Sequence, residues 1–333
     1  MNEATRNRIR GAVLGQAIGD ALGAPTEGMT RAAIRAKYGR VTGYVSDDPA
    51  GTDDTEYAAM TAQILLKAGP DITVNDVARG WIEALVDQVT PFDGGGFSEM
   101  EAIHNLAKGL LPPASGTDNH EMWSDGSGMR VAPIGAYAAG NPVEAARLAG
   151  IDAQVSHARD GIWASQAIAA ATAAAIVSTD WRHIVQAGID VTPPDSWTRR
   201  MIEKAIAIAE GTGTVEERLD ELERRVAIFH YPWADVAPEA IALAFGVFAI
   251  AEGDYSEAVL GGVNIGRDAD TIAAMAGAMA GALNGVDAIP SEWKDRLGPL
   301  RGSCIAAMAG VDLWELADEI ADSVDERKVL SND

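Results

Sequence analysis

Glycines recur at every fourth position in the first apolar segment of the chain, and this spacing constrains the fold more than any other feature. Residues 5–22 carry Gly11, Gly15 and Gly19 beside apolar residues at helical spacing. A glycine inside a helix costs stability relative to alanine, so three in register indicate that another backbone packs closely against this face. The segment is therefore expected to be a buried helix in a helical core.

Helix-period patterns continue along most of the 333 residues. Further helices are expected at residues 54–68, 74–88, 98–110, 128–139, 142–155, 161–178, 195–210, 215–229, 238–252, 255–263, 270–283 and 303–324. Stops such as Gly69-Pro70 separate them. Aromatic residues make up 6% of the chain, and residues 44–46 give the best strand pattern, a weak one. No repeat or low-complexity linker divides the sequence, so we predict a single all-α domain over residues 1–333.

Acidic residues outnumber basic ones by 49 to 26, which gives a net charge of -23. Such a charge repels nucleic acid and anionic membranes, so neither is expected as a partner. A phosphate-bearing substrate would need local positive charge, which bound divalent cations supply. Cys304 is the only cysteine, residues 1–10 do not form a secretory signal, and the apolar stretches are too short to span a bilayer. A cytoplasmic protein is expected, and its oligomeric state stays open.

Two acidic motifs each precede a small, apolar helical segment. Residues 51–56 read Gly-Thr-Asp-Asp-Thr-Glu, and residues 266–271 read Gly-Arg-Asp-Ala-Asp-Thr. Helix capping explains each motif alone, and Asp53 with Glu56 forms a capping-box-like pattern. Both following helices belong in the core, however, so their starts are expected to meet at a cleft. Clustered carboxylates repel one another unless cations are present, and oxygen ligands suit Mg²⁺, Mn²⁺ or Ca²⁺.

Five segments in order resemble motifs of the ADP-ribosylglycohydrolase family, which includes the dinitrogenase reductase-activating glycohydrolase and hydrolases that remove ADP-ribose from protein serine. The segments are residues 11–27, 52–55, 126–133, 156–157 and 264–271. The resemblance covers about residues 8–285, with C-terminal helices following at 290–325. It implies a large orthogonal helical domain and a glycosidase that cleaves the ribosyl C1 bond of an ADP-ribosylated protein or an ADP-ribosyl small molecule.

The same resemblance implies a site that holds two Mg²⁺ or Mn²⁺ ions. The implied metal ligands are Thr52, Asp53, Asp54, Asp268, Asp270 and Thr271. The implied substrate-binding residues are Asp125, Gly126, Ser127, Gly128, Met129, His157 and Arg267. The implied catalytic acids are Asp54, Glu27 and Asp268, with Asp54 or Glu27 as the base that takes a proton from water. In some family members the glutamate matching Glu27 lies on a flexible loop that closes over the site.

Two departures from the family pattern bear on the substrate. The family usually has glycine at the position of Arg267 and often asparagine at that of Asp125. Arg267 either pairs with a substrate phosphate or neutralises an acid, and Asp125 adds negative charge where a pyrophosphate would lie. Residues 95–100 also differ from protein-directed members, which hints at a smaller substrate. Residues 231–235 either contact substrate or form a packed aromatic turn.

Three alternatives therefore stay open beside the leading interpretation. The first is a glycohydrolase acting on a simpler ribosyl compound such as a nucleoside. The second is a catalytically inactive, crystallin-like binder, and the third is an unrelated Mg²⁺ hydrolase acting on phosphoesters or pyrophosphates. The other histidines show no metal-ligand spacing; they are His104, His120, His183 and His230.

Overall fold

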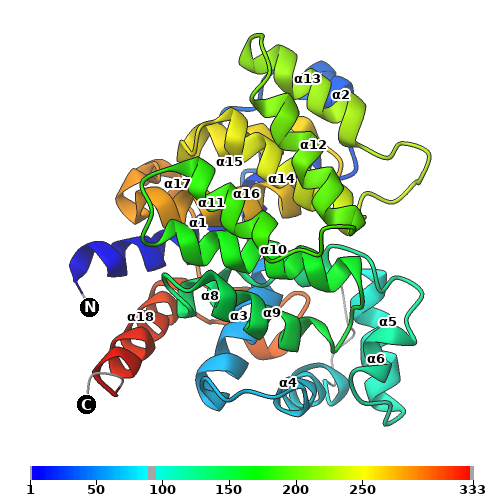
Figure 1. Cartoon of the computed structure of the whole chain (residues 1–333), viewed down its shortest axis with the longest axis vertical. Coiled ribbons are helices and arrows are strands. Elements are labelled where there is room, and N and C mark those ends of the chain that lie inside the picture. Colours follow the sequence, from blue (N-terminus) through cyan, green and yellow to red (C-terminus); the bar gives the residue numbers. More distant parts are fainter. Residues whose placement is uncertain (1, 89–94, 331–333) are drawn as a thin grey trace.

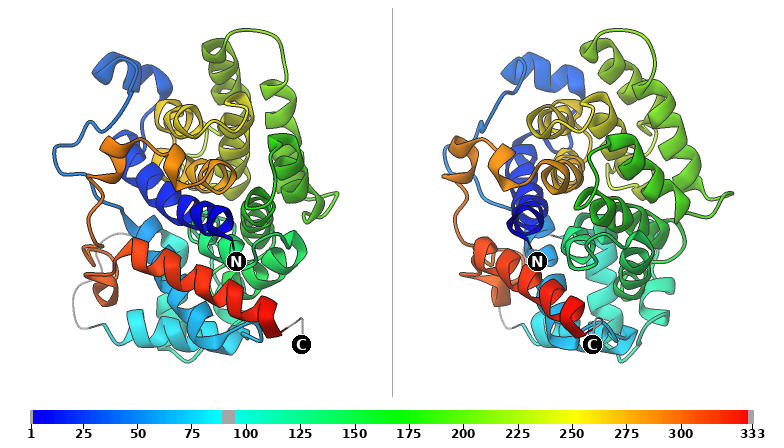
Figure 2. Two further views of the ribbon diagram at one scale, coloured as in Figure 1. Left: turned by 90° about the vertical axis from the view of Figure 1, so that its left-hand side faces the viewer. Right: turned by 60° about the vertical axis from the view of Figure 1, so that its left-hand side comes forward.

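Helix α1 (Glu3–Gly23) runs through the middle of the molecule with α16 (Ala269–Asn284) against it (Figures 1 and 2). The computed structural model describes residues 2–88 and 95–330. A Cβ placed on Gly11 would lie 2.1 Å from the carbonyl oxygen of Gly281, and one on Gly277 would lie 2.3 Å from that of Gly15. The two helices therefore touch backbone to backbone, as the glycine spacing predicts.

Helices account for the fold of the described residues, which contain no extended strand and only two isolated bridges, Thr30–Gly266 and Ser124–Val236. The remaining α-helices are α2 (Arg31–Tyr38), α3 (Asp53–Ala68), α4 (Val74–Trp81), α5 (Phe97–Ala107), α6 (Ala114–Thr117), α7 (Gly126–Met129), α8 (Ala132–Tyr137), α9 (Pro142–Ala153), α10 (Asp160–Ala175), α11 (Trp181–Asp190), α12 (Trp197–Ala209), α13 (Val215–Val226), α14 (Ala237–Ile250), α15 (Tyr255–Ile265), α17 (Ser291–Lys294) and α18 (Leu313–Leu330). The shorter turns are η1 (Ala24–Thr26), η2 (Ile82–Val86), η3 (Val286–Ala288) and η4 (Ala306–Met308). The all-α prediction is confirmed.

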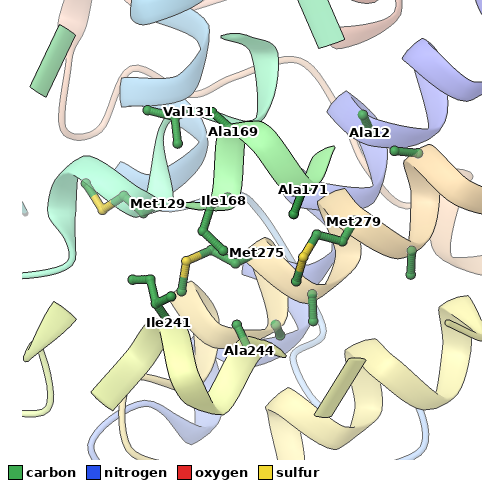
Figure 3. Packing of buried hydrophobic residues seen from close by; sticks show 14 of the residues in the cluster. Ala12, Met129, Val131, Ile168, Ala169, Ala171, Ile241, Ala244, Met275 and Met279 are labelled. Atoms are coloured by element: carbon green, nitrogen blue, oxygen red, sulfur yellow. The ribbon is translucent and has the colours of Figure 1, made fainter. Parts of the chain in front are cut away.

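The core is built where α10, α14 and α16 pack together. Figure 3 shows Ile168, Ile241 and Met275, one from each helix, turned toward one another, and each is at most 1% exposed. Burying each such side chain contributes about 1.5–3 kcal/mol. The same hydrophobic cluster extends from Ile9 near the N-terminus to Val324 in α18.

Two expected features near Glu56 differ in the structure. Its carboxylate accepts hydrogen bonds from the backbone N–H groups of Ser303 (2.9 Å), Cys304 (2.9 Å) and Ile305 (2.6 Å). It therefore does not close a capping box with Asp53, and Thr52 is the residue that caps α3. The expected helix at 303–324 begins only at Leu313, after the turn η4 and Gly310, which adopts φ 84°.

The segment expected as one helix at 74–88 is α4 followed by the wider turn η2, and the segment at 128–139 is divided between α7 and α8. Helices α2 and α11 lie outside every expected range. In the described part of the chain, no helix combines the length and the apolar character that crossing a bilayer requires.

Candidate metal centre and cleft

Three helix ends meet at the two acidic motifs. α1 ends against α16, where a Cβ on Gly23 would lie 2.4 Å from the Cα of Asp270. The first turn of α3 carries Asp53 and Asp54, and that of α16 carries Asp270. Thr271 Oγ1 donates a hydrogen bond of 3.2 Å to Asp54 Oδ1 and so joins the two motifs. The structure thus brings residues 52–54 and 268–271 together.

Carboxylate oxygens at this junction are placed to share a cation. Among the described residues, Glu27, Asp268 and Asp270 each offer an oxygen, and these oxygens lie within 4.8 Å of one another. At the same junction, Asp54 Oδ2 and Asp270 Oδ1 are buried without a hydrogen-bond partner. An unpartnered buried oxygen is costly unless a ligand satisfies it. The all-oxygen donor set fits Mg²⁺ or Mn²⁺.

Burial dominates the electrostatics of this cluster. It raises the pKa of Asp54, Asp268 and Asp270 well above the ordinary value, and repulsion adds to the effect, from Asp270 on Asp54 and from Asp268 on Asp270. Burial also raises the pKa of Glu27 and Asp53. A bound divalent cation acts in the opposite direction because it stabilises the ionised carboxylates.

Asp20 supports the first motif from within α1. Its carboxylate accepts hydrogen bonds from Thr52 N (2.8 Å), Thr52 Oγ1 (2.9 Å), Thr55 N (3.2 Å) and Thr55 Oγ1. Burial raises the pKa of Asp20 to about 7 against the effect of these donors. The hydroxyl proton of Thr52 therefore points to Asp20, and Thr52 is not among the residues that line the cleft. Asp20 is not among the site residues expected from the sequence.

The segment that carries Glu27 is tied to the second motif. Gly28 N donates to Arg267 O (2.7 Å), and Arg267 N donates to Met29 O (2.8 Å). Gly266 adopts φ 75°, and a Cβ there would lie 2.2 Å from the Met29 carbonyl oxygen, so glycine is required. These contacts hold Glu27 beside Asp268 in this structure.

The acids open onto a cleft of about 390 Å³. Its lining contains eight carboxylic acids: Glu27, Asp53, Asp54, Glu99, Asp125, Asp235, Asp268 and Asp270. The described lining contains no lysine or arginine. The other lining residues include Thr271, Gly126, Met129, Phe97 and Trp233.

Four of the expected substrate-binding residues lie behind the cleft wall; they are Ser127, Gly128, His157 and Arg267. Ser127 Oγ donates to Gly161 O (2.8 Å), and a Cβ on Gly128 would lie 3.0 Å from the Ile241 side chain. Asp125, Gly126 and Met129 do line the cleft. Their roles toward substrate stay predictions.

His157 belongs to a buried polar network and is neutral there. Its Nε2 lies 2.9 Å from Ser124 Oγ, and its Nδ1 lies 2.7 Å from Ser156 Oγ. Burial and the neighbouring Arg130 lower the pKa of His157 well below 6.5. Arg130, fully buried, donates to Asp152 (2.8 Å), Ser156 (3.0 Å) and Glu99 (3.3 Å). The network supports the wall without supplying a free positive charge to the cleft.

Arg267 pairs with Glu239. Its Nε donates to Glu239 Oε1 at 2.5 Å, and its guanidinium also reaches Trp233 O at 3.1 Å. Of the two roles open from the sequence, the observed contact is neutralisation of an acid, and it anchors the loop that carries Trp233. Glu99 and Phe97 were not expected in the site, because each lies at a helix start without a motif of its own. Of residues 231–235, whose role the sequence leaves open, Trp233 and Asp235 line the cleft.

The comparisons with known proteins agree with the fold. The ADP-ribosylglycohydrolase family model matches residues 1–328. An uncharacterized protein of Archaeoglobus fulgidus is 32% identical over 312 residues, covering 89% of this chain and 92% of its own length. The uncharacterized protein YegU of Escherichia coli is 26% identical over 318 residues, covering 87% and 91%.

A solved structure described as an ADP-ribosylglycohydrolase-related protein complex has a similar fold. It superposes with a TM-score of 0.68 at 24% identity and covers 97% of this chain and 100% of its own. The family model spans both acidic motifs and the residues that line the cleft, and the archaeal relative covers most of the chain. The chain belongs to the ADP-ribosylglycohydrolase family.

Proposed function

We propose that this chain is a glycosidase that uses two divalent cations to hydrolyse the C1 bond of a ribosyl group. The observation that carries the proposal is the convergence of five acids, from three helix ends, on one cleft: Glu27, Asp53, Asp54, Asp268 and Asp270. Membership of a glycohydrolase family supports the reaction class. The candidate substrates are ADP-ribosylated proteins, ADP-ribosyl small molecules and simpler ribosyl compounds.

The chain's own residues suit this reaction. Two bound Mg²⁺ or Mn²⁺ ions would supply the positive charge that orients ribose hydroxyls and a water molecule. Thr271 fixes Asp54 by a hydrogen bond and leaves the second oxygen of Asp54 free for a ligand. Glu27 is exposed at the rim, so it can take a proton from water and pass it to solvent. The surrounding carboxylates favour the positive charge that develops on the ribose ring as the C1 bond breaks.

Metal removal tests the proposal directly. Hydrolysis of ADP-ribosyl-arginine and ADP-ribosyl-serine peptides and of nucleosides is measured before EDTA treatment, after it, and after Mg²⁺ or Mn²⁺ is restored. Activity on at least one substrate should vanish with EDTA and return with the metal. Undiminished turnover by fully metal-free protein would refute the scheme. Release of AMP from the ADP-ribosyl peptides would instead favour a hydrolase acting on the pyrophosphate.

Substitutions separate metal binding from proton transfer. Asp54→Asn and Asp270→Asn should abolish the heat of Mg²⁺ or Mn²⁺ binding in calorimetry. Glu27→Gln should lower kcat by about 10²–10⁴-fold, the range for loss of a general base, with metal binding largely retained. Asp190→Asn, which removes an exposed acid outside the cleft lining, is the matched control. Absence of metal binding by the unmodified protein would support the inactive-binder alternative.

A further inference from the structure

A second cavity, of about 320 Å³, lies between α13, α14 and α15 and shares no lining residue with the acidic cleft. These three helices contact one another (Figure 1). The floor of the cavity is aliphatic, and its residues Leu219, Val247, Ile250 and Leu260 are each at most 7% exposed. No aromatic residue of the described chain lines it. A cavity of this size accommodates a small molecule with an aliphatic part.

Arg218 lies on the face of α13 that packs against the other helices. Val215, Arg218, Leu219 and Leu222 recur at helical spacing, and both leucines are buried. An arginine thus occupies a position where an apolar residue would extend the contact with α14. Its side chain lines the cavity instead.

The charge of Arg218 has no acidic partner in the described part of the chain, although its own helix is rich in acids. Arg31 alone contacts three of those acids, and Thr214 and Arg225 take the other two. The five acids of α13 are Glu216, Glu217, Asp220, Glu221 and Glu223. Each therefore has a partner other than Arg218, and the guanidinium faces the cavity without a counter-ion.

One edge of the Arg218 guanidinium is also without acceptors. Nη1 donates to the carbonyl oxygen of Ala209 at the end of α12 (2.7 Å). Nε is buried without a hydrogen-bond partner, and Nη2 has none among the described residues. The Nε and Nη2 edge is the one that binds a carboxylate through two parallel hydrogen bonds. Since buried donors normally have acceptors, this edge indicates an acceptor that comes with a ligand.

The acids at the rim favour a ligand with a single negative charge. Glu216 and Glu257 line the cavity, and both bond to Arg40, which lines it as well. Glu252 also lines the cavity and forms no ion pair with the residues that the structure describes. Because Glu252 would repel a second negative charge, a monocarboxylate suits this rim better than a phosphate dianion.

We propose that the cavity between α13, α14 and α15 binds a small aliphatic monocarboxylate, with its carboxylate on Arg218 and its hydrocarbon chain on Leu219, Val247 and Ile250. Burial of the chain contributes affinity, and the guanidinium selects the charge. The site uses neither acidic motif, so it does not rest on the proposed glycosidase activity.

Calorimetric titration of full-length, metal-loaded protein with 4-methylpentanoate tests the proposal. Saturable binding is expected, with a dissociation constant of about 1 mM or lower. The neutral 4-methylpentanamide should bind at least about tenfold more weakly, because it cannot accept two charge-assisted hydrogen bonds. Inorganic phosphate, which lacks the chain, should also bind more weakly. Absence of saturable carboxylate binding, equal binding of the amide or tighter binding of phosphate would each overturn the proposal.

Substitutions test whether Arg218 holds the carboxylate. Arg218→Met keeps a long apolar side chain and should weaken binding of 4-methylpentanoate about 10–100-fold, the range for a lost hydrogen bond to a charged group. Arg224→Met removes an exposed arginine of the same helix outside the cavity lining and should bind normally as the matched control. Unchanged affinity in Arg218→Met would contradict the assignment.

A variant of the cavity wall keeps the test decisive if Arg218→Met unfolds, since Arg218 also bonds to the end of α12. Ala251→Leu enlarges a side chain that lines the cavity and leaves Arg218 in place, so it should weaken binding by filling the space for the chain. Urea unfolding measures the stability of each variant. Normal binding by folded Ala251→Leu protein would place the ligand elsewhere and reject the site.

Metal ions in the cleft also attract carboxylates, so the titration is repeated with EDTA-treated protein and with Asp54→Asn. Asp54 lies outside the cavity lining. The affinity for 4-methylpentanoate should be unchanged in both, and its loss would assign the carboxylate to the metal centre and overturn this inference. Failure of the glycosidase assays would leave the binding result standing, so the two proposals fail separately.

Discussion

Thr271 Oγ1 and Asp54 Oδ1 form a hydrogen bond of 3.2 Å between residues 217 positions apart in the chain. The bond directs one oxygen of Asp54 to protein and leaves Oδ2 buried without a partner. Asp270, one residue before Thr271, likewise has an unpartnered buried oxygen. This hydrogen bond thus joins the first turns of α3 and α16. The two buried oxygens without a donor are available to a cation, and they lower the stability of the metal-free protein.

Metal-free protein should lose stability as the pH rises from 5 to 7.5. Burial raises the pKa of Asp235 to about 6 and that of Asp20 to about 7, from an ordinary value of 3.8. The folded state therefore holds these protons more tightly than the unfolded chain. Their contribution is complete below pH ~4 and is lost as the pH passes through 6 and 7, by up to about 1.4 kcal/mol per pH unit for each proton.

Urea unfolding of EDTA-treated protein at several pH values measures the slope of the unfolding free energy against pH. Saturating Mg²⁺ should flatten or reverse it, because the cation binds the ionised carboxylates. Metal-free protein that becomes more stable between pH 5 and 7.5 would contradict the role of the buried acids.

Asp20→Asn should weaken metal binding although Asp20 does not line the cleft. The substitution replaces an acceptor of four hydrogen bonds from Thr52 and Thr55 with an amide that can accept only part of them. Loss of a partner that orients metal ligands typically costs 10–100-fold in affinity. Calorimetric titration with Mn²⁺ checks this, with Thr55→Ser, which retains the hydroxyl, as the control. Unchanged affinity would show that Thr52 to Asp54 are held by the helix alone.

Gly277→Ala should destabilise the protein although alanine is the better helix former. Helix propensity alone predicts a gain of about 0.5–1 kcal/mol. The new Cβ would lie 2.3 Å from the carbonyl oxygen of Gly15, however, and a backbone atom cannot move aside cheaply. Overpacking of this kind costs about 1–3 kcal/mol, so net destabilisation is expected in urea unfolding. Gly298→Ala, which meets nothing within 4 Å, is the control, and equal stability of both variants would argue against the close packing of α1 on α16.

Most helices with an apolar face could be predicted from the sequence, although α11, which buries Trp181, Ile184 and Val185, was missed. The glycine register of α1 predicted a close backbone contact, because such a contact depends on side-chain size, and the structure identifies α16 as the partner. α2 was missed because only Arg31 and Ile34 are buried in it. Its position depends on ion pairs between Arg31 and the acids of α13, including Asp220 at 2.6 Å, and local periodicity does not record such pairs.

The two acidic motifs could be predicted from the sequence, and the residues that form the cleft wall around them could not. Residues 52–54 and 268–271 are short, contiguous patterns, and the structure brings them together. Asp20 and Glu99 are single acids whose place in the site depends on how distant segments fold. Asp235 was indicated only as part of residues 231–235, whose role the sequence left open. Asp20 carried a signal of its own, since it is the only charged residue of α1 between Gly11 and Gly23.

Variants of Arg267 can distinguish a structural role of this residue from a role in binding substrate. It adopts φ 61°, a left-handed conformation that costs a non-glycine residue about 1–2 kcal/mol. Its guanidinium nevertheless pairs with Glu239, which is 0% exposed, and packs over the Phe229 ring at 5.4 Å. Arg267→Gly relieves the backbone cost but leaves a buried carboxylate unpaired, which typically costs about 3–5 kcal/mol. The single variant should therefore be less stable.

A double variant tests whether Arg267 and Glu239 affect stability through their contact with each other. Glu239→Gln removes the buried charge and keeps an acceptor for Ile228 N, which now donates to Glu239 Oε2 at 2.6 Å. Arg267→Gly with Glu239→Gln should recover most of the stability lost in Arg267→Gly, because the two effects are coupled through contact. If Arg267 only neutralises Glu239, the double variant should also keep the unmodified protein's ratio of kcat/KM between phosphorylated and unphosphorylated ribosyl compounds. A selective rise in KM for the phosphorylated compounds in the stable double variant would instead assign Arg267 to phosphate.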